Sequence, residues 1–160
     1  MNTKVIMLDE ENLDRDAIEE AGKIIRDGGL VAFPTETVYG LGANALDNDA
    51  VKKIFEAKGR PQDNPLIVHI SELEDIKSLV EEVPEIACKF MNRFWPGPMT
   101  IILPKSSIIP DATSASLPSV GIRMPSNIIA RELIRAAKVP VAAPSANISG
   151  RPSPTDVQRC

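Results

Sequence analysis

Two kinds of apolar pattern alternate along the chain. In one, apolar residues recur every three to four positions, which predicts amphipathic helices with one buried face. In the other, short continuous apolar runs predict buried strands. The first helical pattern begins after Asp14 and the second at Asp47 or Asn48. Three more begin at Ser71, Pro84 and Ser126. The strand-like runs cover residues 30–33, 65–70, 99–103, 120–124 and 139–143. Such alternation favours an α/β fold in which helices flank an open sheet.

Local signals mark where several of these elements begin and end. Gly28-Gly29 and Gly59 are typical helix stops, and Ser71 with Glu74 forms a capping-box pattern. A second capping-box pattern, Thr155 with Gln158, predicts a helix at the end of the sequence. One turn of helix is not stable alone, so we expect residues 1–160 to be a single domain that lacks its C-terminal part.

Two stretches do not fit the alternating pattern. Residues 105–118 form a polar segment bounded by prolines, and its length predicts a mobile, functional loop. Gly40-Leu41-Gly42 has only part of the glycine pattern of a dinucleotide-binding turn and is therefore a weak signal.

The composition narrows the class of protein. The 160 residues are 43% hydrophobic and 25% charged, as in a globular domain, and no apolar run is long enough for a membrane span. The net charge of −4 argues against general attraction to nucleic acid, so a basic site must be local. One histidine and two cysteines cannot form a His/Cys zinc cluster, and we expect a cytoplasmic, reduced protein.

The clearest cationic candidate is Lys58-Gly59-Arg60-Pro61, at the end of a predicted helix. Both cations are favourable near a helix C-terminus, where the backbone dipole is negative. They are also suited to phosphate, because arginine offers a bidentate fork and lysine a point charge. The local pattern leaves both interpretations open.

Other candidates are hydroxyl groups and lone polar residues in apolar strands. Thr35, Thr37 and Tyr39 alternate by two, so an extended backbone would place them on one face, as strand residues or as substrate contacts. His69 is either a core histidine or a residue that faces a cleft. Arg123 lies in a predicted buried strand and therefore needs an anionic partner.

Pro144-Ser145-Ala146-Asn147 follows the last predicted strand. Serine and asparagine side chains often bond to the backbone of their own turn. Ligands of open α/β sheets also bind beyond strand ends, so both roles remain open.

The chain carries four polar segments, at residues 34–41, 58–66, 119–123 and 144–147. In this order and spacing, the segments resemble the YrdC-like domain of threonylcarbamoyl-AMP synthases. The resemblance implies a twisted open sheet flanked by helices, with a deep, positively lined cavity. It implies an enzyme that makes threonylcarbamoyl-AMP and pyrophosphate from L-threonine, bicarbonate and ATP. The product would serve the threonylcarbamoyl modification of the adenosine next to the tRNA anticodon, with tRNA engaged through a downstream transferase complex.

The resemblance also implies roles for individual residues. Threonine would contact Thr37, His69, Arg123 and the Ala143 backbone. ATP would contact Arg60, Asn64, Ser119, Ser145 and Ser153. Lys58 and Arg60 would supply the catalytic positive charge, and Thr35, Tyr39 and Asn147 would support the site. Mg²⁺ is expected to arrive with ATP, while the metal ligands remain unknown.

Two other functions are compatible with the sequence. One is an RNA-binding accessory module, although the net charge and the 4% aromatic content argue against recognition by stacking. The other is a related carbamoyl-adenylating transferase, as in hydrogenase maturation. We also expect self-association through an apolar surface that is left uncovered.

Overall fold

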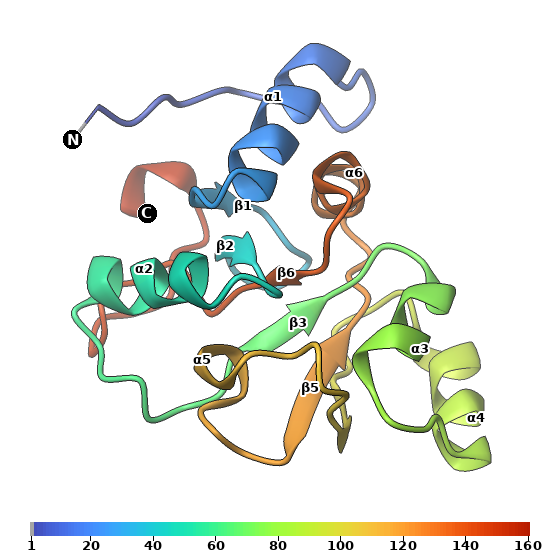
Figure 1. Ribbon diagram of the computed structural model, residues 1–160. Helices are drawn as coiled ribbons and strands as arrows, with labels where there is room; N and C mark the ends of the chain where they lie inside the picture. Colours follow the sequence, from blue (N-terminus) through green and yellow to red (C-terminus); the bar gives the residue numbers. More distant parts are fainter. Residues whose placement is uncertain (1) are drawn as a thin grey trace.

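A mixed six-stranded sheet forms the centre of the computed structural model, which describes residues 2–160 (Figure 1). The strand order is β1-β2-β6-β3-β5-β4. Strands β3 and β5 are parallel, and the other neighbouring pairs are antiparallel. The strands are β1 (Val31–Phe33), β2 (Gly40–Asn44), β3 (Ile67–His69), β4 (Ile101–Pro104), β5 (Ser119–Arg123) and β6 (Val141–Ala142).

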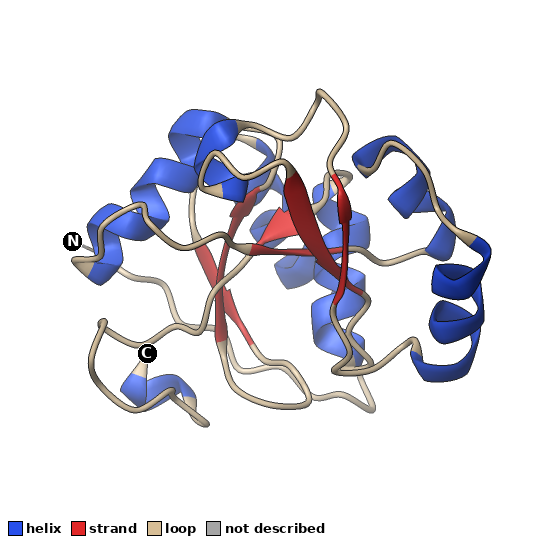
Figure 2. Cartoon of the chain, turned by 90° about the horizontal axis from the view of Figure 1, so that it is seen from below, coloured by secondary structure: helices blue, strands red, loops and turns tan. Residues whose placement is uncertain are grey.

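Helices lie on both sides of the strands (Figure 2). The prediction of an α/β fold with an open sheet and flanking helices is therefore confirmed. The α-helices are α1 (Arg15–Arg26), α2 (Asn48–Lys58), α3 (Ile76–Leu79), α4 (Glu85–Phe94), α5 (Asp111–Ser114) and α6 (Ile128–Ala137). Two 3₁₀ turns are η1 (Leu73–Asp75) and η2 (Val157–Arg159). None of these helices has the length and hydropathy that a bilayer crossing requires.

The two faces of the sheet belong to two apolar cores. On the first face, α1 and α6 pack together and cover Phe33 and Val141. On the second face, residues of α2, α3 and α4 pack with Val68, Ile122 and Ala142. Val141 and Ala142 are in different cores because successive strand residues point to opposite faces.

The helix starts show how far local chemistry determines the fold. Asp14 caps α1 as predicted. Asp47, one of the two predicted starts of the second helix, caps α2, and its carboxylate accepts from the N–H groups of Asp49 and Ala50. Gly59 ends α2 in the left-handed conformation, with φ of 59°.

Three predicted helix starts are wrong by one residue. The capping box consists of Glu72 and Asp75, instead of Ser71 and Glu74. Asn127 caps α6 through the Ala130 N–H, so the predicted cap at Ser126 is wrong. At η2 the capping side chain belongs to Asp156 instead of Thr155. Acidic and amide side chains one residue further on reach the free N–H groups in each case.

Strand β2 was missed because its sequence, Gly-Leu-Gly-Ala-Asn, has low strand propensity. Its glycines have a packing role instead of forming a nucleotide-binding turn. A Cβ at Gly42 would lie 2.8 Å from the Phe33 ring and 2.8 Å from a Val141 methyl group. The small residues of β2 therefore leave the space that the Phe33 ring fills.

The prediction of a mobile loop at residues 105–118 is also wrong. It contains α5, and the side chains of Ile109, Ala112 and Thr113 are buried. The Thr113 hydroxyl donates a 2.8 Å hydrogen bond to the Ala45 carbonyl. This segment covers the second core, which explains its apolar positions.

One helix keeps a row of apolar side chains in solvent. Ile86, Phe90 and Phe94 of α4 are 60%, 46% and 49% exposed, while Ala87 and Met91 face the core. The rings of Phe90 and Phe94 stack with centroids 6.0 Å apart. We call these three side chains the α4 apolar face. Ile24, Leu73 and Ile128 are also exposed.

Helices α1 and α6 leave part of the first face open. Strand register places Ile67, Gly121 and Ile102 side by side on this face. Ile102 is 69% exposed, and Ile67 and Gly121 are half-buried. This open part of the sheet borders His69 and Arg123.

Candidate functional site

Arg123 is the charged group at the centre of the candidate site. It ends β5, beside His69 of β3, and the residue is 8% exposed. Its guanidinium forms an ion pair with Glu36, and its Nε donates to the Gly97 carbonyl at 3.3 Å. Burial lowers the pKa of Arg123 from its ordinary value, but an arginine remains charged at neutral pH. The anionic partner that the sequence required is therefore Glu36.

The Glu36 carboxylate also binds the segment before α6. Its second oxygen accepts from the Ser126 N–H at 2.5 Å and from the Ser126 hydroxyl at 2.6 Å. Glu36 was not among the predicted site residues. The available signal was its place between Thr35 and Thr37, in the most polar of the four segments.

The prediction that Thr35, Thr37 and Tyr39 share one face of an extended backbone is wrong. Residues 36–38 form a bend instead of an extended strand, so Thr35, Thr37 and Tyr39 do not share a strand face. The Thr35 hydroxyl donates to the Val38 carbonyl at 2.7 Å, and the Thr37 N–H donates to the Thr35 hydroxyl at 3.2 Å. Thr37 itself is exposed. The bend places Thr37 directly after the carboxylate that pairs with Arg123.

His69 lies on the first face with a buried, neutral ring. Its Nδ1 is 3.2 Å from the Ile67 carbonyl, and the Phe33 ring meets it edge to face at 6.1 Å. Burial lowers the pKa of His69 from 6.5 to about 4. His69 can therefore contribute shape and hydrogen bonding, without positive charge near pH 7.

A second group of predicted residues meets at the end of β6. The buried Lys58 donates through Nζ to the carbonyls of Ser145 and Asn147, the latter at 2.7 Å. The Ser145 hydroxyl is 2.5 Å from Asn147 Oδ1. The Asn147 amide donates to the Arg151 carbonyl at 2.8 Å. The pKa of Lys58 is lowered mainly by burial and, to a smaller extent, by repulsion from Arg60. Lys58 thus ties the end of α2 to the 145–147 turn.

Backbone pairing joins the two groups of residues. Gly40 and Ser145 form an isolated antiparallel bridge, and the Ala146 N–H donates to the Tyr39 carbonyl at 2.8 Å. The Ala143 N–H donates to the Ile67 carbonyl at 3.0 Å. Burial is the main reason that the pKa of Tyr39 is raised, with smaller contributions from Cys160 and Asp156.

The remaining predicted ATP contacts lie nearer the surface. Arg60 follows Gly59 at the end of α2 and is half-buried. Ser119 begins β5 opposite Pro104 and is also half-buried. Asn64 and Ser153 are exposed. The described contacts do not link these two residues to the Arg123 group.

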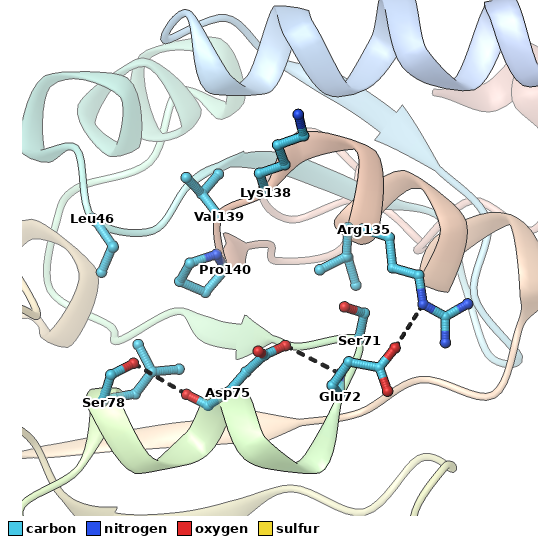
Figure 3. Close-up of a pocket in the computed structure, with 11 residues that line it drawn as sticks. Leu46, Ser71, Glu72, Asp75, Ser78, Arg135, Lys138, Val139 and Pro140 are labelled. Atoms are coloured by element: carbon cyan, nitrogen blue, oxygen red, sulfur yellow. Dashed lines mark hydrogen bonds and ion pairs between the residues drawn. The ribbon is translucent and has the colours of Figure 1, made fainter.

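A hollow of about 440 Å³ lies elsewhere, between α3, α6 and the start of β6 (Figure 3). No residue of the predicted site lines it. Its charged side chains have both signs: Glu72 and Asp75 against Arg135 and Lys138, with Arg135 paired to Glu72. The deep, positively lined cavity remains a prediction.

Trp95, Gly97 and Met99 support Arg123 from the segment after α4. The Trp95 indole is 7% exposed and donates to the Met99 carbonyl at 2.7 Å. The Gly97 N–H donates to the Met124 carbonyl at 2.8 Å, which fixes the peptide whose carbonyl receives Arg123. The sequence gives little sign of this support for Arg123, because the acceptors are backbone carbonyls.

Comparison with known proteins gives consistent results. A family model of the Sua5/YciO/YrdC type, described as "Telomere recombination", matches residues 23–160. The threonylcarbamoyl-AMP synthase of Pyrococcus abyssi is 56% identical over 151 residues, which are 94% of this chain and 44% of that protein. The Bacillus subtilis protein of the same name is 51% identical over 162 residues, with coverage of 99% and 47%.

A solved structure supports the same relationship. The crystal structure of P. abyssi Sua5 complexed with L-threonine matches with a TM-score of 0.91 and 55% identity, over 92% of this chain and 44% of that chain. The present chain thus spans less than half the length of each of these relatives. On the extent of the model match and these identities, the chain belongs to the Sua5/YciO/YrdC family.

Proposed function

We propose that this chain functions as an L-threonylcarbamoyladenylate synthase, a nucleotidyltransferase that uses L-threonine, bicarbonate and ATP. The observation that carries the proposal is the match to the threonine-complexed relative, at 55% identity over 92% of the chain. The geometry is compatible, because Arg123, His69 and the bend with Thr37 border the open part of the first face.

In this proposal the threonine carboxylate binds Arg123. The threonine amine takes up carbon dioxide from bicarbonate as a carbamate. A carbamate oxygen then attacks the α-phosphate of ATP, and pyrophosphate leaves. The protein contributes position and charge, as is usual in phosphoryl and nucleotidyl transfer.

The ATP side would be formed by the second group of residues. Arg60, Asn64, Ser119, Ser145 and Ser153 are the proposed ATP contacts. Lys58 holds the carbonyls of the 145–147 turn with two of its three N–H donors, so its charge stays beside that turn. The proposed role of Asn147 is to support Ser145, and its amide contact with Arg151 extends that support to the next residues.

Mg²⁺ is proposed to enter as the complex with ATP. Between residues 2 and 160 the structure holds no group of three or more His, Cys, Asp or Glu side chains arranged for a metal ion. Most of the magnesium ligands would then be phosphate oxygens and water, which is common for this ion. The ion would offset phosphate charge alongside Lys58 and Arg60.

The proposed cellular role is to supply the adenylate for threonylcarbamoyl modification of tRNA in the cytoplasm. The tRNA would meet a downstream transferase complex instead of this chain. A titration with RNA at several salt concentrations separates this role from an RNA-binding module.

The test is pyrophosphate release from ATP. Release should require both threonine and bicarbonate, and carbamoyl phosphate should not replace them. No release above the ATP-only background would rule out synthase activity for this chain. Release that depends on carbamoyl phosphate would favour the related carbamoyl transferase.

The substitution Arg60→Ala tests the phosphate role. Loss of a charged hydrogen bond should weaken ATP binding by roughly 1.5–3 kcal/mol, or about ten- to a hundredfold. Calorimetry measures the affinity, and Arg93→Ala on the exposed end of α4 is the matched control. Unchanged ATP affinity in the Arg60 variant would mean that Arg60 does not bind phosphate and only complements the helix dipole.

A further inference from the structure

Glu36 has an unusual set of partners for a side chain outside the predicted site. One oxygen pairs with Arg123, and the other receives both the N–H and the hydroxyl of Ser126. The Glu36 side chain is 21% exposed and that of Arg123 is 10% exposed. A fixed carboxylate therefore stands beside the guanidinium, with part of its surface open to solutes.

Arg123 retains donors for a ligand. A guanidinium has five N–H donors in a planar fork. Nε is directed to the Gly97 carbonyl, and one terminal nitrogen pairs with Glu36. The second terminal nitrogen remains for an incoming carboxylate.

The charge balance around Arg123 limits which ligand fits. Glu36 already neutralises the arginine, and the neighbouring His69 ring is neutral near pH 7. A ligand with only a carboxylate would place two anions around one cation, and like charges at such distances repel. An α-amino acid avoids this problem, because its ammonium can lie against Glu36 while its carboxylate binds Arg123.

We propose that Glu36 is the subsite for the ammonium group of the amino-acid substrate, so that Glu36 and Arg123 together recognise a zwitterion. This inference rests on the proposed function, since it assigns a second charged contact to the same substrate. The attraction is specific to the free amino acid. Once the amine becomes a carbamate, its nitrogen is neutral and Glu36 no longer binds a cation there.

The test compares two ligands that differ only in the ammonium group. L-threonine and (R)-3-hydroxybutanoate share the carboxylate, the hydroxyl and the methyl group. Affinities are measured by calorimetry, with competition against threonine for the weaker ligand. The wild-type chain should bind threonine about ten- to a hundredfold more tightly, as expected for one charged hydrogen bond.

The variant Glu36→Gln keeps the size of the side chain and an oxygen that can accept from Ser126. It should lose most of the threonine affinity while its affinity for 3-hydroxybutanoate stays the same or rises. Glu72→Gln is the matched control, since Glu72 also pairs with an arginine but lies in the separate hollow of Figure 3. The control should keep the wild-type preference.

The other outcomes are also informative. Equal losses for both ligands would show that Glu36 only positions Arg123, and would overturn the ammonium subsite. A wild-type chain that binds both ligands equally would overturn it even if the variant fails to fold. A wild-type chain that binds neither ligand would contradict the proposed function itself, and the subsite with it.

Discussion

His69 shows how burial sets the charge of a single residue. The ring is enclosed by the strands and the Phe33 ring, and its pKa is lowered to about 4 mainly by loss of solvation. In the unfolded chain a histidine has a pKa near 6.5. Between these values the unfolded chain binds a proton that the folded chain rejects, so stability rises with pH across this window.

We expect His69→Gln to remove this pH dependence. The histidine contribution is fully present above pH 6.5 and is lost as the pH falls toward 4. Over that interval the unfolding free energy of the wild type should fall by about 3 kcal/mol more than that of the variant. Urea denaturation of both proteins at several pH values measures the difference, and effects of the carboxylates cancel. Parallel stability curves would show that His69 is solvated.

For single residues, the sequence predicts that a contact is needed, but it does not predict which residue supplies it. Arg123 in an apolar strand required an anion, because a buried unpaired charge is costly. That Glu36 supplies it depends on the bend at residues 36–38, which puts the carboxylate over β5. The two carbonyls that Lys58 contacts lie 87 and 89 positions further along the sequence, and only the folded chain brings them to Lys58.

At the scale of elements, those with local sequence signals are predictable and those defined by their neighbours are not. Caps and apolar spacing are local, so α1 and α2 match their predicted starts. Strand β2 is defined by its neighbours: it pairs with β1 and β6 and receives the Phe33 ring over its glycines. No pattern of β-branched residues marks such a strand.

The substitution Gly42→Ala should therefore destabilise the fold. The new methyl group would lie 2.8 Å from both Phe33 and Val141, too close for any real Cβ. Overpacking of this kind costs typically about 1–3 kcal/mol, measured as the shift in urea midpoint at constant slope.

A double-mutant cycle tests the cause. Phe33→Leu removes the ring that the new methyl group would meet, so Gly42→Ala should cost less in that background. If the cost is the same in both backgrounds, the ring contact is not the reason for the glycine.

At the scale of the molecule, the order of local patterns predicts the open α/β architecture. It does not predict which apolar surfaces stay exposed. The expectation of self-association remains a prediction, and the structure offers two places for it. One is the α4 apolar face, and the other is the edge strand β4 with the exposed Ile102. Contiguous exposed apolar side chains and unpaired strand edges both favour association.

We expect the α4 apolar face to dominate, because its two phenyl rings are large and already stacked. Phe90→Lys should then lower the average mass measured by light scattering at high concentration, whereas Ile102→Lys should change it little. A larger effect of the Ile102 substitution would assign the association to the sheet edge. A wild-type chain that stays monomeric at every concentration would contradict the expectation altogether.

The segment after α4 gives the site an optical probe. The chain has one tryptophan, and Trp95 lies two residues from the Gly97 carbonyl that receives Arg123. Its buried indole donates to the Met99 carbonyl, so the chromophore is held within the same short segment. A ligand that draws on the guanidinium alters the electric field and hydrogen bonding of that segment. Occupancy of the amino-acid site should thus be visible as a change in tryptophan fluorescence, without a label and from a single indole.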